Sequence, residues 1–179
     1  MKKIFVILLI VFTGIGSAFA ATDTASHDVT ITVSEVVLLE LNDSTGISLS
    51  TTSPGAGSAG LSVTGETDST KRLYYTSLVS SGTTRTITAE IDSAITLPGL
   101  ALQLSSTAAG GTEGSGAGAV TLSTTPQTIV SNIGSCATGN TASDGANLTY
   151  TLVVTDENAL QVDATGQTVT VTLTLTDAL

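Results

Sequence analysis

Cysteine and histidine are the side chains that most often supply a nucleophile and its base, and this chain has one of each. Cys136 has no second cysteine with which to close an intrachain disulfide. A nucleophilic thiol needs a nearby base, and the only imidazole belongs to His27, near the N-terminal end, where chains are usually loosely held. We therefore expect Cys136 to be a packed, buried thiol and His27 to have no catalytic role.

Paired carboxylates could catalyse glycoside hydrolysis, and two pairs qualify by residue type. They are Glu66 with Asp68 and Asp156 with Glu157, both in polar, turn-like sequence where acidic side chains are normally solvated. Glycosidases commonly hold sugars with aromatic side chains, yet the chain has no Trp and only three Tyr. We expect no enzymatic activity, no catalytic residue and no metal site.

A glycine-rich stretch at residues 55–60, Gly-Ala-Gly-Ser-Ala-Gly, fits the pattern of a dinucleotide-binding loop. In such a site the glycines follow a strand and open a helix whose N-terminus holds the pyrophosphate. Here Pro54 comes before the glycines and a strand-like segment comes after them. The sequence therefore predicts a glycine-rich turn and no cofactor.

The N-terminal residues 1–20 have the features of a cleaved export signal. Lys2 and Lys3 precede an apolar run at residues 4–12, and Ala18-Phe19-Ala20 fits a cleavage site. The apolar run is shorter than the roughly 20 residues of a membrane-spanning helix. We expect a secreted or cell-surface protein that begins at Ala21 and does not insert into the membrane.

The charge balance excludes some partners. Removal of the signal leaves three basic residues against fifteen acidic ones, a net charge near −12. Such a surface argues against nucleic acid and anionic membranes. Charged residues make up 11% of the chain, well below the roughly 25% of ordinary soluble domains. Thr, Ser, Ala, Gly and Val take their place, a composition typical of β-strands and turns.

Strict alternation of aliphatic residues and threonine marks the strongest predicted strand, at residues 168–176. Residues 147–154 and 86–91 alternate in the same way. Further strands are expected at residues 47–50, 61–64, 73–79, 100–104, 119–122 and 128–133. Two Gly-, Ala- and Ser-rich segments, residues 54–60 and 108–119, are predicted to be flexible surface loops.

Many short strands separated by turn residues predict an immunoglobulin-like antiparallel β-sandwich, with a small closed β-barrel as the alternative. Residues 35–179 would form one such domain, without a helix. Seven residues are expected on its inner face: Leu73, Ile87, Ile91, Leu152, Val169, Val171 and Leu173.

The segment before this domain, residues 21–34, has an alternating pattern of its own. Val29, Ile31 and Val33 alternate with threonines, and an apolar run at residues 36–41, typical of a strand buried on both faces, follows. Two interpretations remain open. The segment is either the start of one long strand with a bulge at residues 34–35 or a separable N-terminal arm.

Sheet edges are usually protected by Lys, Pro or inward charges, and the best predicted strands contain none of these. An export signal, an alternating arm and a Thr-rich sandwich that ends in an alternating strand together resemble the fimbrial and spore-coat-U-like subunits of secreted filaments. The resemblance implies a sandwich that polymerises when the arm of one subunit completes the sheet of the next. Val29, Ile31 and Val33 would then belong to a donor strand at residues 28–34.

Two functions follow as expectations. The first is a self-assembling structural subunit of an extracellular filament, pilus or matrix fibre. The alternative is a monomeric adhesive or glycan-binding module that contacts a surface glycan or a cell surface. In the alternative, the polar loops at residues 110–118 and 138–146 would make the contact, because binding residues concentrate on loops held by a rigid scaffold.

Overall fold

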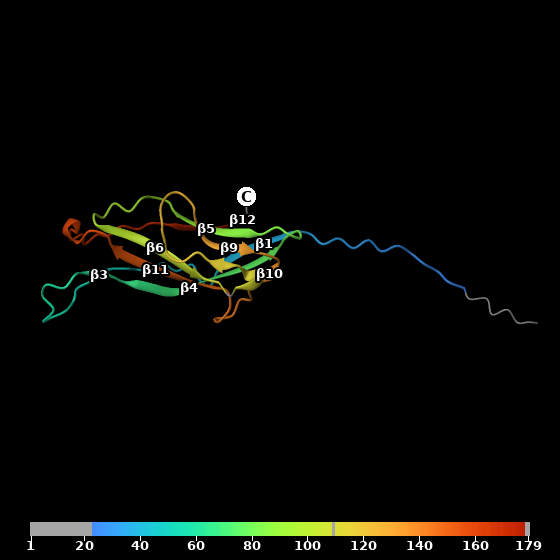
Figure 1. Ribbon diagram of the computed structural model, residues 1–179, viewed down its shortest axis with the longest axis horizontal. Coiled ribbons are helices and arrows are strands. Elements are labelled where there is room, and N and C mark those ends of the chain that lie inside the picture. The colour runs from blue at the N-terminus through green and yellow to red at the C-terminus, as the bar shows by residue number, and fades with distance from the viewer. Residues whose placement is uncertain (1–22, 109, 178–179) are drawn as a thin grey trace, which may run out of the picture. The chain divides into compact units, whose positions relative to one another are not determined.

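The computed structural model describes residues 23–108 and 110–177, and the chain divides into two units between Thr32 and Val33. The described part of the first unit, residues 23–32, contains no helix or strand. The second unit consists of β-sheets (Figure 1). The predicted export signal at residues 1–20 lies outside the described residues.

Two antiparallel sheets form the second unit. The first has the order β1-β4-β11-β6-β8, with β10 also paired to β4, and the second has the order β12-β5-β9-β7. A small hairpin pairs β2 with β3. The strands are β1 (Val36–Leu41), β2 (Thr51–Thr52), β3 (Thr64–Gly65), β4 (Thr67–Leu78), β5 (Arg85–Ile91), β6 (Leu100–Thr107), β7 (Ser115–Gly116), β8 (Val120–Thr121), β9 (Gln127–Ile133), β10 (Cys136–Ala137), β11 (Ala146–Val154) and β12 (Val171–Asp177).

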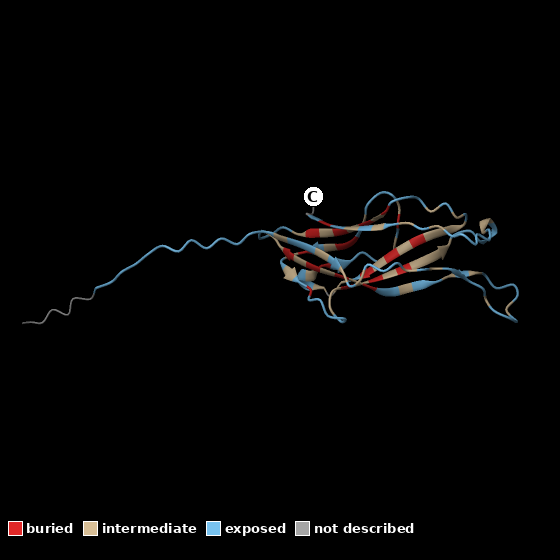
Figure 2. Ribbon diagram, turned by 180° about the vertical axis from the view of Figure 1, so that it is seen from behind, coloured by how far each residue is buried: buried red, intermediate tan, exposed pale blue. Residues whose placement is uncertain are grey.

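This architecture confirms the predicted antiparallel β-sandwich. Helical structure in the described residues is limited to two single 3-10 turns, Gly111–Glu113 and Glu157–Ala159. Buried residues alternate with more exposed ones along the strands of both sheets (Figure 2). The period of two in the sequence therefore places one face of each strand in the core.

Three of the seven residues predicted for the inner face lie in the buried core. Leu73, Ile87 and Ile91 are fully buried between the sheets, together with residues such as Ile129 and Leu148. Three predicted core residues lie at the rim, partly buried and packed against this centre: Val169, Val171 and Leu173. Leu152, near the end of β11, is only partly buried.

The apolar run at residues 36–41 was predicted to be buried on both faces, and this is wrong. It forms β1, which pairs only with β4 in the described structure, so β1 is an edge strand. The side chains of Val37 and Leu38 are 45% and 61% exposed. A continuous apolar run indicates that both faces of a strand are apolar, but not that other segments of the same chain bury both faces.

The prediction of a strand at residues 47–50 is also wrong. No strand forms over residues 47–50, although Ile47 and Leu49 pack against the core. The alternation of the two side chains reflects their burial, which an extended loop can provide as well as a strand.

The glycine-rich segment at residues 108–119, predicted to be a flexible loop, closes one side of the sandwich. It contains a 3-10 turn and β7, which pairs with β9, and it leads into β8, which pairs with β6 in the other sheet. Glycine is required in β7, because a Cβ atom on Gly116 would lie 1.9 Å from the carbonyl oxygen of Ser106. The segment therefore passes from one sheet to the other.

Candidate functional site

The predicted donor strand within the N-terminal arm, residues 28–34, presents a row of aliphatic side chains. Its described residues belong to no strand, so the interpretation of residues 29–41 as one long bulged strand is wrong. The side chains of Val29, Ile31 and Val33 are 69%, 85% and 74% exposed. Single exposed aliphatic residues are common. Three at a spacing of two residues would share one face of a strand, and here all three side chains are exposed.

The sandwich has an opening along one side, which we call the seam. Its two borders are β1 in one sheet and β12 in the other, and each pairs on one side only in the described part of the chain. A groove of about 210 Å³ lies between them. Its lining is apolar apart from one glutamate: Leu39, Glu40, Leu41, Leu73, Val171 and Leu173.

The inward face of β1 is incompletely covered at the seam. Val37, Leu39 and Leu41 share this face because they alternate along the strand. Val37 nevertheless remains 45% exposed, whereas Ser77, its partner in β4, is 1% exposed. The Ser77 hydroxyl has no hydrogen-bond partner among the described residues. At this border of the seam, the inward side chains of β1 are therefore left partly exposed, and no neighbouring strand of the described structure covers them.

The opposite side of the sandwich differs, because the chain closes it. There the amide of Ala117 donates to the carbonyl oxygen of Ile129 in one sheet at 2.9 Å. The amide of Leu122 donates to the carbonyl oxygen of Leu102 in the other sheet, also at 2.9 Å. On the seam side, by contrast, no described strand or hydrogen-bonded segment bridges β1 and β12.

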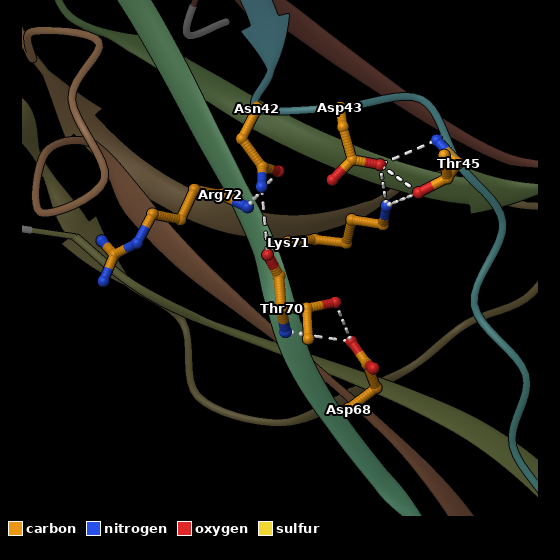
Figure 3. A network of polar contacts seen from close by, with 7 residues as sticks. All are labelled: Asn42, Asp43, Thr45, Asp68, Thr70, Lys71 and Arg72. Atoms are coloured by element: carbon orange, nitrogen blue, oxygen red, sulfur yellow. Dashed lines mark hydrogen bonds and ion pairs between the residues drawn. The ribbon is translucent and has the colours of Figure 1, made fainter.

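A polar network fixes the end of β1 next to the seam (Figure 3). The side chain of Asn42 accepts from the amide of Arg72 at 2.8 Å and donates to the carbonyl oxygen of Thr70 at 3.1 Å. It thus bonds the β4 backbone where β1 ends. The network holds this border of the seam against β4.

Lys71 reaches into the same network from the inward face of β4, where its side chain is buried. Its Nζ atom donates to Asp43 Oδ1 at 2.5 Å and to Thr45 Oγ1 at 3.1 Å. The bond from Lys71, followed by bonds that the hydroxyl and amide of Thr45 donate to the same carboxylate, lowers the pKa of Asp43 to about 2. A buried ammonium group needs such partners, so this pair serves the structure and is not a free reactive amine.

A second ion pair involves Glu35, the residue that lies between the arm and β1 in the sequence. The Glu35 carboxylate pairs with the guanidinium of Arg85, whose side chain is buried at the start of β5. Glu35 directly precedes β1 and follows the arm. The pair therefore ties the residue at the base of the arm to the second sheet.

Cys136 lies in β10 and is partly buried. Burial raises the pKa of its thiol, and the nearby Glu113 carboxylate adds to the effect. No histidine occurs in residues 33–179, so a general base of that type is lacking in this unit. His27, in the first unit, is exposed. A raised thiol pKa is the opposite of what a nucleophilic cysteine requires.

The acidic pairs considered for catalysis have structural partners. Asp156 caps a 3-10 turn by accepting from the amide of Asn158, and Glu157 accepts from the amide of Val63 at 2.9 Å. Glu66 accepts from the amide of Ser50. Across residues 23–177, with position 109 left out, no three His, Cys, Asp or Glu side chains form a group that could hold a metal ion.

A second groove, of about 410 Å³, involves the loop at residues 138–146, named above for the alternative function. Its lining includes Leu38, Tyr74 and Asn140. The Tyr74 hydroxyl donates to the carbonyl oxygen of Thr141 at 3.0 Å. The aromatic ring and the loop are therefore held in a fixed relation.

The seam was not predicted from the sequence, although the arm was. The arm has a local pattern, whereas the seam joins β1 to β12, at opposite ends of the domain sequence, and depends on which strands lack partners. Comparison with protein-family models, curated proteins and solved structures finds no match for this chain. None of the helical turns in the described part of the chain is long and apolar enough to span a lipid bilayer.

Proposed function

We propose that this protein is a structural subunit of an extracellular filament, and that it polymerises by donating the N-terminal arm to a second copy. The observation that carries the proposal is the exposed row of Val29, Ile31 and Val33 in a chain whose sandwich has an open, apolar seam. The arm has a face to bury, and the seam has a face to be covered.

The physical basis is β-strand addition. An extended segment supplies backbone hydrogen bonds to a free sheet edge, while alternate side chains fill the groove beside it. Burial of three aliphatic side chains contributes roughly 5–8 kcal/mol before the cost of ordering the arm. A head-to-tail contact of this kind forms a closed ring only if the rotation between neighbouring copies adds up to a full turn. Otherwise it generates a fibre.

Substitution within the arm tests the proposal. Ile31→Asp places a charge on the face that would be buried, whereas Thr32→Asp places the same charge on the face that would point outward. Negative-stain electron microscopy of the processed protein should show filaments for the wild type and for Thr32→Asp, and none for Ile31→Asp.

Removal of residues 21–34 provides the control for folding. The truncated protein should keep the β-type circular dichroism spectrum and the cooperative unfolding of the full chain, but form no filaments. If the wild-type protein stays monomeric at high concentration, or if Ile31→Asp assembles as the wild type does, the proposal is wrong.

The groove beside Tyr74 favours a second candidate function, binding of a glycan by a monomeric module. The aromatic ring lies next to the polar side chains of Thr76 and Asn140. A sugar could stack on the ring and form hydrogen bonds with the polar groups. Saturable binding of the monomeric protein on a glycan array, lost in Tyr74→Ala, would support it. Filaments that form without any such binding would favour the first function.

A further inference from the structure

We infer that the arm of a second copy adds to the free edge of β12, and not to that of β1, so that it extends the β12-β5-β9-β7 sheet across the seam. This inference rests on the proposed function and goes beyond it, because it names the edge that accepts the strand. The acceptor would be β12, Val171–Asp177, and the occupant residues 28–34 of another molecule.

The first argument is the scarcity of charge on β12, whose one charged residue, Asp177, is its last. Residues 171–176 are Val-Thr-Leu-Thr-Leu-Thr, with no charged residue and no proline. The other border, β1, carries Glu40 as its next-to-last residue, within the lining of the groove. Charged side chains and proline are the usual protection of edge strands, so β12 is the less protected border.

The second argument is a row of threonines on the outer face of the sheet that contains β12. Thr174 pairs with Thr88, and Thr176 pairs with Thr86, across the β12–β5 ladder. The Oγ1 atoms of Thr86 and Thr176 lie 3.4 Å apart. On β12 these threonines are exposed, whereas on β5, which has neighbours on both sides, they are only partly so. The row of threonines therefore ends at the free edge of β12, where exposed threonines could pair with threonines of an added strand.

The arm has the sequence that continues this row. Thr30 and Thr32 alternate with Val29, Ile31 and Val33, as the threonines of β12 alternate with its aliphatics. In a strand paired with β12, the arm threonines would lie beside Thr172 or Thr174, a favourable cross-strand pair. The three aliphatics would then point into the groove, towards Leu39 and Leu173.

The connection to β1 favours a second copy over the arm of the same molecule. To fill its own seam, the arm would have to turn back on β1 through residues 34–35. Two-residue hairpin turns require positive φ angles and strongly prefer Asn, Asp or Gly, whereas this connection is Ser34-Glu35. The ion pair of Glu35 with Arg85 further holds the second of these residues.

Disulfide trapping between two populations of molecules tests the edge. Both populations carry Cys136→Ser, which removes the only native thiol. The donor population carries Thr32→Cys, and the acceptor population carries Thr172→Cys, Thr174→Cys or Thr176→Cys, one at a time, because the register is open. Matched acceptors place the cysteine on the outer face of β1 instead, as Leu38→Cys or Glu40→Cys.

Oxidation of the mixed populations should give a donor–acceptor heterodimer on non-reducing gels. We expect at least tenfold more heterodimer with the best β12 acceptor than with either β1 acceptor. Filaments of the same mixtures are examined by electron microscopy, so that assembly is scored separately from the cross-link.

Each other outcome overturns the inference in a distinguishable way. More heterodimer with a β1 acceptor, or filaments without any cross-link, would refute β12 as the edge and leave the filament function standing. In a separate protein that carries both Thr32→Cys and the acceptor cysteine, a cross-link within the monomer in place of one between molecules would refute the second copy as the occupant. Absence of filaments from every mixture and from the wild type would refute the proposed function itself.

Discussion

Lys71 is the one lysine beyond residue 3, and it is placed where a lysine is costly to keep. Its side chain is buried on the inward face of β4, and its charge is stabilised by Asp43 and Thr45. The Asp43 side chain is 42% exposed, but its removal would leave the buried ammonium group of Lys71 without its carboxylate, which is destabilising. The pair is therefore expected to matter for the stability of the seam border.

The low pKa of Asp43, about 2, makes this contribution depend on pH. Because the folded-state pKa lies below the ordinary value of about 3.9, the interaction stabilises the fold at higher pH and is lost as the pH falls towards 2. Urea unfolding should therefore show Asp43→Asn less stable than the wild type at pH 5, with a smaller difference at pH 2. Asp28→Asn, outside the sandwich unit, is the control and should show neither effect. A difference that stays constant over this range would contradict the prediction.

The thiol of Cys136 should react slowly. Its pKa is raised by burial and by the nearby Glu113 carboxylate, so little thiolate is present near neutral pH. A disulfide reagent at pH 7.5 should modify it at least tenfold more slowly than the cysteine in a Cys136→Ser, Ser81→Cys protein, in which residue 81 is exposed in a turn. Equal or faster labelling of Cys136 would indicate a depressed pKa and would reopen a nucleophilic role.

At the scale of elements, β7 and its glycine decide how one side of the sandwich closes. A Cβ atom on Gly116 would meet the Ser106 carbonyl oxygen at 1.9 Å, so the backbone has to move. Gly116→Ala should destabilise the fold by about 1–3 kcal/mol, the usual cost of overpacking. Gly46→Ala is the matched control, because nothing lies within 4 Å of that position. Thermal unfolding that is equally affected by both changes would contradict this view of β7.

The strands that the sequence predicts best are those with one buried and one polar face. Residues 86–91 and 147–154 were predicted from alternation, and they lie within one residue of β5 and β11. The long strand β4 was predicted from Leu73 onward, although it begins at Thr67, because its first six residues are polar and show no alternation of apolar side chains. Alternation therefore identifies a strand only where one of its faces is buried.

The sequence predicts the arm but not the seam, for one physical reason. Val29, Ile31 and Val33 are close in the sequence, so their common face follows from local geometry alone. The border residues Leu39 and Val171 come together only through the pairing of β1 with β4 and of β12 with β5. Pairings between distant strands are not encoded by a short pattern.

At the scale of the whole molecule, charge sets how easily copies approach one another. The chain carries five basic and fifteen acidic residues, a formal net charge of −10. Identical acidic molecules repel each other, and salt screens this repulsion because the Debye length falls from about 30 Å at 0.01 M to about 3 Å at 1 M. Assembly followed by light scattering should therefore be faster in about 0.5 M than in about 0.02 M sodium chloride. Slower assembly in the higher salt would indicate that attraction between opposite charges drives it.

The order of the strands has a consequence for the speed of folding. In the described residues, β2 and β3 are the only paired strands that follow each other in the sequence, whereas β1 pairs with β4, β4 with β11 and β5 with β12. Such non-local pairing is typical of domains that fold in roughly milliseconds to seconds. The chain has no Trp, so the buried rings of Tyr75 and Tyr150 provide the natural fluorescence signal for stopped-flow refolding. During that interval both borders of the seam are exposed to other chains, so the folding molecule is then at its most vulnerable to incorrect pairing.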